Sequence, residues 1–114
     1  MKKISKKQSE IKRKLHKVYS EIAMERGHFC EGCGKTESGV ALSHSHIIPR
    51  SRRRDLITDK KNIQYLCLSM GGRLGCHDKW ESRNKDQLLC YHKNLEYILE
   101  VDTEYYFLIT ELNA

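Results

Sequence analysis

Residues Ala41–Arg50 read ALSHSHIIPR, and this stretch organises the interpretation of the whole chain. Apolar and small polar residues alternate along it as in a β-strand, and Pro49 ends the pattern because proline lacks the amide hydrogen that a strand ladder uses. Side chains two residues apart lie on the same face of an extended chain, so we expect His44 and His46 to point the same way. Two neighbouring imidazoles are typical of a chemical site, but two ordinary surface histidines explain these residues equally well.

The length and composition describe one small domain. The chain has 114 residues, of which 39% are hydrophobic and 32% charged, so it can form one modest core. No run approaches the roughly 18 apolar residues that span a bilayer, and the lysine-rich start lacks the apolar stretch of a signal peptide. We therefore expect a cytoplasmic protein with no membrane partner. Five cysteines in a reducing compartment indicate metal binding more than disulfides.

The charges are unevenly distributed along the chain. Residues 1–26 contain nine Lys or Arg against three Glu, which accounts for the whole net charge of +6. Residues 50–61 carry six basic and two acidic side chains, whereas residues 86–114 carry one Lys against six acids. A basic front and an acidic back predict an oriented polyanionic partner. A solvated helix face is the alternative, although it explains scattered lysines better than the packed arginines Arg50, Arg52, Arg53 and Arg54.

Helical patterns occur at both ends of the chain. Residues 5–26 carry an apolar stripe at helical spacing with basic residues around it, and Gly27 is a natural end. Residues 85–112 predict one or two further helices, with Asp102 as an N-cap between them. We expect these C-terminal helices to pack against the first helix and their acids to face away from a nucleic acid. A dimer or partner interface on their apolar residues stays open.

The cysteines form two pairs. Cys30 and Cys33 make a Cys-x-x-Cys knuckle, and Cys67 and Cys76 flank a glycine-rich insert. Four thiolates in two pairs fit a closed tetrahedral zinc site of structural type. A redox Cys-x-x-Cys is the competing interpretation, but the βαβ pattern that such a motif needs is missing. The fifth cysteine, Cys90, lies in a helical pattern and is expected to be a small buried residue.

The segment between the pairs completes the expected architecture. Residues 63–68 read as a short strand, which would form an antiparallel hairpin with the strand at residues 41–48 through the arginine-rich loop. From Cys76 the pattern becomes helical and continues through the apolar residues up to Tyr91. His77 and Glu81 are four residues apart and so lie one turn apart on one helix face.

These motifs resemble the HNH endonuclease superfamily, the ββα-metal nucleases, in the subgroup with two cysteine pairs that is common in phage and mobile-element proteins. The resemblance covers residues 30–81 and implies an α+β fold, in which a small ββα-metal core holds a structural zinc. An N-terminal basic helix at residues 5–26 and C-terminal helices at residues 85–112 would flank this core within a single domain, 1–114. The motifs that carry it are Cys30-x-x-Cys33, SHIIPRS at residues 45–51, Asn62-Ile63-x-x-Leu66-Cys67 and Cys76-His77-x-x-x-Glu81.

The resemblance also implies roles for single residues. His46 matches the general base, Asn62 the asparagine that supports the loop of the base, and His77 a ligand of the catalytic metal. Ser45 stands where the family usually has a metal-binding Asp or His, so His44 or water would have to take that place. Glu81 stands where a histidine is common, and a carboxylate ligand favours Mg²⁺ or Mn²⁺.

The resulting functional hypothesis is a metal-dependent endonuclease that hydrolyses phosphodiester bonds in DNA. His46 would take the proton of the attacking water, and the divalent ion would stabilise the transition state and the leaving group. The Arg50–Arg54 loop would bind phosphates without reading sequence. The expected role is phage DNA processing, restriction or recombination in the host-cell cytoplasm, alone, as a homodimer or with a phage protein. The alternatives are a non-catalytic zinc-dependent nucleic-acid binding module and a structural subunit of a phage DNA-handling assembly.

Overall fold

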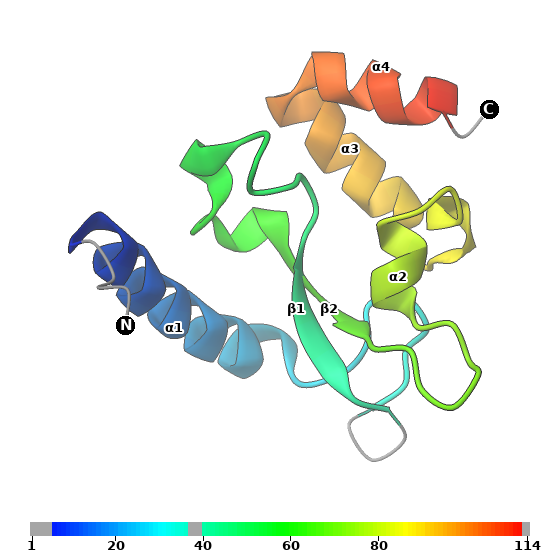
Figure 1. Ribbon diagram of the computed structural model, residues 1–114, viewed down its shortest axis with the longest axis horizontal. Helices are drawn as coiled ribbons and strands as arrows, with labels where there is room; N and C mark the ends of the chain where they lie inside the picture. Colours follow the sequence, from blue (N-terminus) through cyan, green and yellow to red (C-terminus); the bar gives the residue numbers. More distant parts are fainter. Residues whose placement is uncertain (1–5, 37–39, 113–114) are drawn as a thin grey trace.

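The computed structural model describes residues 6–36 and 40–112, and it has the α+β architecture that the sequence predicts. Helices surround a single two-stranded sheet (Figure 1). None of the helices in the described part of the chain is long and apolar enough to cross a bilayer. The helices and strands are α1 (Lys6–Arg26), β1 (Leu42–His46), β2 (Ile63–Cys67), α2 (Cys76–Trp80), α3 (Tyr91–Val101) and α4 (Thr103–Leu112), with short 3₁₀ turns at Arg54–Leu56, Lys60–Asn62 and Lys85–Gln87.

The two strands form the predicted antiparallel hairpin. Leu42 lies opposite Cys67 at one end of the ladder, and His46 lies opposite Ile63 at the other. The arginine-rich loop, residues 47–62, connects the strands and contains the first two 3₁₀ turns. The two ends of the hairpin therefore carry different residues, cysteine at one end and histidine at the other.

Strand β2 is buried along its whole length because helices cover both faces of the hairpin. Ile63 and Tyr65 point to one face and join a core cluster with Leu15 and Ile22 of α1. Leu66 points to the other face and belongs to the core cluster that contains α2 and the C-terminal helices. Figure 1 shows α1 on one side of the hairpin and α2, α3 and α4 on the other.

The expectation that the C-terminal helices pack against α1 is wrong. Ile98 of α3 and Ile109 of α4 pack in the cluster of Trp80, while α1 belongs to the separate cluster on the opposite face. Each face of a thin two-stranded sheet needs an apolar cover, and the helices at the two ends of the chain supply one each. The first helix therefore packs against Ile57 of the loop and Ile63 at the histidine end of the hairpin.

The helical pattern that starts at Cys76 is interrupted, which corrects the expectation of a helix continuing to Tyr91. Helix α2 ends at Trp80, and α3 begins only at Tyr91. Between them the backbone N–H of Leu89 donates to the carbonyl of Gly32 at 2.8 Å, which fixes the chain beside the first cysteine pair and leaves Leu88 buried. The turn therefore gains a tertiary contact that a continuous helix would lose.

The break between the two C-terminal helices is the one that the sequence predicts. Asp102 ends α3, and its carboxylate accepts a hydrogen bond from the backbone N–H of Tyr105 at 3.1 Å. This is the N-cap geometry that satisfies an otherwise unpaired amide in the first turn of α4.

Candidate active site and metal centre

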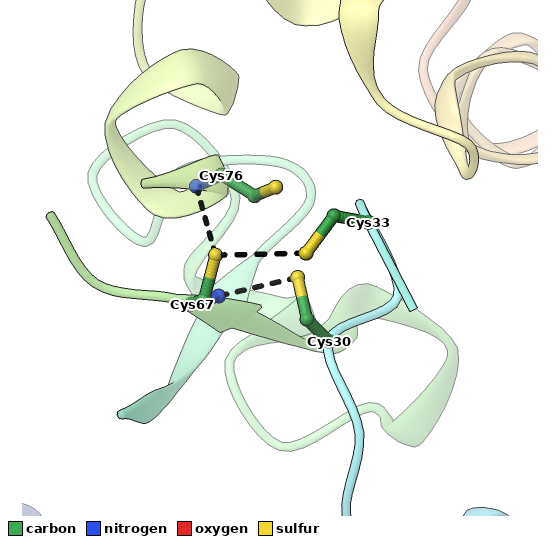
Figure 2. A group of neighbouring side chains, drawn as sticks. All are labelled: Cys30, Cys33, Cys67 and Cys76. Carbon is green, nitrogen blue, oxygen red and sulfur yellow. Dashed lines mark hydrogen bonds between the residues drawn. The ribbon is translucent and has the colours of Figure 1, made fainter. Parts of the chain in front are cut away.

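Four cysteine side chains converge at one end of the hairpin (Figure 2). Their sulfur atoms all lie within 4.8 Å of one another, and those of Cys33 and Cys67 are 3.9 Å apart. Four sulfurs placed tetrahedrally at ~2.3 Å from a zinc ion would be separated by about 3.8 Å. The cluster of Cys30, Cys33, Cys67 and Cys76 therefore has the ligand type and the spacing of a closed metal site.

Backbone amides and glycines shape this cluster. The N–H of Cys67 points to the sulfur of Cys30 at 3.3 Å, and the N–H of Cys76 points to the sulfur of Cys67 at 3.4 Å. A Cβ on Gly32 would lie 2.9 Å from the sulfur of Cys76, and one on Gly75 would lie 2.3 Å from the carbonyl carbon of Leu68. Gly32 is therefore required by its close approach to the side chain of Cys76, and Gly75 by its close approach to the backbone at the end of β2.

Burial disfavours ionisation of the cluster thiols, and hydrogen bonds offset it to different extents. Burial raises the pKa of Cys30 and of Cys76. Burial also acts against ionisation of Cys67, but hydrogen bonds from the Cys76 amide and the Arg73 guanidinium outweigh it and lower the pKa to about 6. Four thiolates this close repel one another, so a bound cation is what would allow all of them to ionise. Cys90 is buried outside the cluster, as predicted, and its thiol points to Gln64.

His46 lies at the opposite end of the hairpin and is held by one hydrogen bond. Its Nε2 is 2.8 Å from the carbonyl oxygen of Ile57, which can only accept, so Nε2 carries the proton. The neutral ring then has its lone pair on Nδ1. Burial of the imidazole lowers the pKa of His46 below the ordinary value, with a further contribution from the positive charge of Arg50. His46 is therefore held as the neutral Nε2–H tautomer, in which Nδ1 can accept a proton.

Asn62 is fully buried and joins the strand of His46 to the arginine-rich loop. Its Oδ1 accepts from the backbone N–H of Ile48 at 2.7 Å, and its Nδ2 donates to the carbonyls of Ile48 at 3.1 Å and Leu56 at 3.2 Å. Leu56 immediately precedes Ile57, whose carbonyl holds His46. The amide of Asn62 thus fixes both sides of the loop that orients the imidazole.

His77 of α2 and Glu81, the residue that follows this helix, meet as the four-residue spacing predicts. The Nε2 atom of His77 lies 3.0 Å from a carboxylate oxygen of Glu81, whose side chain is 62% exposed. The other ring nitrogen, Nδ1, is 2.7 Å from the hydroxyl of Ser43, which itself donates to the carbonyl of Leu66. The single hydroxyl proton is thereby used, so Ser43 accepts a hydrogen bond from Nδ1–H and leaves the Nε2 lone pair facing the carboxylate.

This pair of atoms fits a cation. A nitrogen lone pair and a carboxylate oxygen 3.0 Å apart repel unless a proton or a metal ion lies at them. Within the described residues, no third His, Cys or acidic side chain joins His77 and Glu81 in a compact ligand cluster. The remaining coordination positions would fall to water and substrate oxygens, which is how Mg²⁺ is commonly bound.

His44 and Ser45 lie apart from this pair. The ring of His44 stacks on Tyr19 of α1, with the centroids 3.7 Å apart and an interplanar angle of 10°. It shares its strand face with His46, while the residues on either side of it, Ser43 and Ser45, point to the α2 face. Ser45 is only 3% exposed. The structure therefore does not bring His44 beside His77.

A cleft of about 560 Å³ is lined both by His46 and by the pair His77 and Glu81. It runs along the open edge of β1, between α1 and α2, and so reaches both faces of the hairpin. A strand with no neighbour on one side allows this, because a ligand at its edge meets side chains from both faces. The lining residues that matter here are Tyr19, His44, His46, Arg50, His77 and Glu81.

The four loop arginines divide into two kinds. Arg52 and Arg53 bind the C-terminal helices: Arg52 makes two contacts with the Asp102 carboxylate at 3.0 and 3.3 Å, and Arg53 donates to the carbonyl of Val101 at 2.7 Å. Arg52 also lies over the ring of Tyr105, 5.0 Å from its centroid. Arg50 and Arg54 are exposed, and Arg50 lines the cleft.

These contacts attach the C-terminal helices to the basic loop, which the sequence does not predict. Asp102 lies beside the arginines, and their hydrogen bonds and charges lower the pKa of its carboxyl group. The sequence separates the partners by about 50 residues, so no local pattern could reveal the pairing.

Two further site residues were not identified from the sequence. Ser43 belongs to no motif, although strand alternation places it on the face opposite His44 and thus toward α2. The carbonyl oxygen of Ile57 orients His46, and any residue type at this position could supply that backbone atom, so the sequence does not reveal it.

The comparisons agree with this geometry. The model of the family HNH endonuclease matches residues 30–83, which run from the first cysteine of the cluster to just beyond Glu81. The searches of curated proteins and of solved structures found no match.

Proposed function

The chain carries a domain of the HNH endonuclease family at residues 30–83, and from this premise we propose that it is a metal-dependent endonuclease that hydrolyses phosphodiester bonds in DNA. The observation that carries the proposal is the state of His46. Its Nε2–H is bound by the carbonyl of Ile57, so the free lone pair lies on Nδ1 of a neutral, partly buried imidazole in the cleft. General base catalysis needs a neutral imidazole that is held in one orientation.

In this proposal, His46 removes a proton from the water that attacks the phosphodiester. The proton is accepted at Nδ1, and the resulting positive charge is delocalised over a ring whose opposite N–H is already bound to the Ile57 carbonyl. Asn62 acts as a positioning residue, because its amide holds both the segment that follows His46 and the segment that precedes the carbonyl. The base is thus fixed before substrate arrives, which reduces the reorganisation needed for reaction.

His77 and Glu81 would hold one divalent ion, and Ser43 would fix the His77 tautomer that exposes Nε2. When bound, such an ion supplies Lewis-acid stabilisation of charge on the phosphate and on the leaving oxygen. The carboxylate makes this pair harder than the two histidines common in the family, so we propose Mg²⁺ or Mn²⁺ as the catalytic ion. Stronger cleavage with Zn²⁺ than with Mg²⁺ would contradict this assignment.

The cysteine cluster would hold a structural zinc ion. Its four ligands leave no coordination position for substrate. The cluster connects the knuckle at Cys30, the end of β2 and the start of α2, and α2 is the element that presents His77. Zinc binding would therefore support the catalytic site from a distance.

The basic loop would contact the DNA backbone. Arg50 and Arg54 are exposed and suited to phosphates, whereas Arg52 and Arg53 are already bound to the C-terminal helices. Phosphate contacts fix register without reading bases, so we expect low intrinsic sequence selectivity. From the motif resemblance we propose a role in DNA processing, restriction or recombination of a phage or mobile element.

A non-catalytic zinc-dependent nucleic-acid binding module is the second candidate. The observation that favours it is Ser45, which stands in the position of the missing metal ligand and is nearly buried. His44 does not replace this ligand, because its ring is stacked on Tyr19. The two candidates differ in whether the cleft cuts the DNA that it binds.

Conversion of supercoiled plasmid to nicked or linear DNA distinguishes them. The purified protein is assayed with Mg²⁺, with Mn²⁺ and without a divalent ion, beside His46→Ala and the exposed histidine variant His92→Ala. We expect metal-dependent cutting that falls about 10²–10⁴-fold in His46→Ala and is unchanged in His92→Ala. Salt-sensitive DNA binding without cutting in either metal would favour the binding module.

A further inference from the structure

A second hollow adjoins the cleft and is lined by the first half of α1. It measures about 440 Å³ and is bordered by Gln8, Ile11, Lys12 and Leu15 together with Arg50 of the loop. Arg50 also lines the cleft that contains His46. The two hollows therefore meet at one exposed arginine, and the surface continues from the catalytic cleft onto α1.

The core fixes which side of α1 faces this surface. Leu15 and Ile22 are buried and pack against residues of the loop and β2, so the helix cannot rotate about its axis. Successive residues turn by about 100°, which places Lys12 and Tyr19 within about 20° of each other on one flank. Tyr19 lines the cleft, and Lys12 lines the adjoining hollow. Lys14 lies about 160° from Lys12 on the far side of the helix.

The charge of this flank is free to bind an anion. Lys12 and Arg50 are exposed, and among residues 6–36 and 40–112 neither forms an ion pair with a carboxylate. Lys60, by contrast, is bound by Glu21 at 2.9 Å and by Glu25 at 3.0 Å, both from α1. Glu21 and Glu25 are thus directed to the loop lysine, and the third acid of α1, Glu10, lies about 160° from Lys12 around the helix, which leaves the Lys12 flank positive.

We propose that this α1 groove binds the DNA backbone on one side of the phosphodiester bond that is cleaved in the cleft. The groove is lined by Gln8, Ile11, Lys12, Leu15 and Arg50. The inference rests on the proposed function, because it assumes that DNA occupies the cleft. From Gln8 to Tyr19 the helix rises about 16 Å, which equals the axial rise of about five base pairs of duplex. DNA that enters the cleft can follow this flank, with Arg50 at the junction and Lys12 beyond it.

Salt-dependent binding of a 20-base-pair duplex tests the inference. Full-length zinc-loaded protein is titrated in buffer without Mg²⁺, at several salt concentrations, by fluorescence anisotropy. Removing one phosphate-binding charge lowers the slope of log K against log salt by about 0.9, which corresponds to about fivefold weaker binding at 0.15 M salt. We expect this change for Lys12→Gln and a larger one for Lys12→Glu.

Lys14→Gln is the matched control, since it removes the same charge from the same helix at an exposed position. We expect its affinity and salt slope to stay close to those of the unmodified protein. Equal effects of Lys12→Gln and Lys14→Gln, or no effect of either on a protein that binds DNA, would overturn the α1 groove. An unmodified protein that binds no DNA would instead overturn the proposed function.

Discussion

The protein carries two candidate metal sites that differ in their exposure to solvent. At the end where Leu42 pairs with Cys67, four sulfurs surround one point and three of the four cysteines are buried. In the cleft, His77 and Glu81 offer two atoms to solvent, and Glu81 is 62% exposed. A closed ligand set can stabilise a fold but has no position for substrate, whereas an open pair can bind a phosphate but stabilises little.

The two sites meet at the start of α2. Cys76 and His77 are neighbours in the sequence, yet the first points into the cysteine cluster and the second toward Ser43 and Glu81. A short helix whose first residue is held by the cluster can therefore present its second residue at a fixed angle. The difference between the two sites predicts that removing the closed site destroys the fold, while changing the open site alters reactivity alone.

The largest expected effect is loss of the fold on disruption of the cysteine cluster. Structural zinc contributes about 10–16 kcal/mol in small zinc domains, which is as large as the whole stability of a typical domain, about 5–15 kcal/mol. We expect Cys67→Ser to lose zinc and cooperative thermal unfolding, as measured by metal analysis and circular dichroism. Cys90→Ser changes a buried thiol outside the cluster and should keep both. A normally stable Cys67→Ser would show that the cluster does not support the fold.

Asn62→Ala is expected to have the next largest effect. The substitution leaves the amide of Ile48 and two carbonyl groups without their partner in a fully buried position. We expect the free energy of unfolding to fall by about 1–3 kcal/mol in a urea titration. Asn84→Ala removes an amide that bonds only to its near neighbours Ser82 and Gln87, and it should change stability far less.

Glu81→Gln should affect metal use and leave stability unchanged. The carboxylate is mostly exposed, so its loss removes little from the folded state. Outer-shell changes at metal sites already cost about 10–100-fold in metal affinity, and loss of a direct ligand should cost no less. We expect at least a tenfold higher Mg²⁺ concentration for half-maximal cutting, with an unchanged melting temperature. The same response in the exposed α4 variant Glu111→Gln would contradict the assignment.

The smallest expected effect concerns pH. His46 acts as a base only when neutral, and its pKa is lowered by burial, so cutting at saturating Mg²⁺ should be constant at neutral pH. It should fall tenfold per unit on the acid side, with a midpoint below pH 6.5. Arg50→Gln removes a nearby positive charge that favours the neutral ring and should move the midpoint upward by less than one unit. A midpoint above pH 6.5 in the unmodified protein would contradict a buried base.

The sequence predicted the hairpin and the cysteine cluster because local rules govern both. Alternation from Leu42 to His46 and the turn at Pro49 indicate the strand, and paired cysteines have few other uses in a reducing compartment. The contact of His77 with Glu81 follows from helical spacing alone. Each of these features is marked by a short motif, although the motifs themselves come together from up to 37 positions apart.

The features that the sequence did not reveal depend on residues that are far apart. The carboxylate of Asp102 binds Arg52 across 50 positions, and this pairing determines which arginines remain free for phosphates. The position of the C-terminal helices depends on which hairpin face α1 already covers. Neither property leaves a periodic signal, because both arise only once the core is assembled.

The measurement that tests the separation of the two sites most directly combines metal content, circular dichroism and plasmid cutting on one sample. The protein is dialysed without added divalent ions, its zinc is measured, and Mg²⁺ is then titrated in. We predict one zinc ion per chain, a fully folded spectrum throughout and cutting that begins only with Mg²⁺. Cutting by the dialysed protein in proportion to its zinc content would show that the cysteine site and the reactive site are not separate, and would contradict the account.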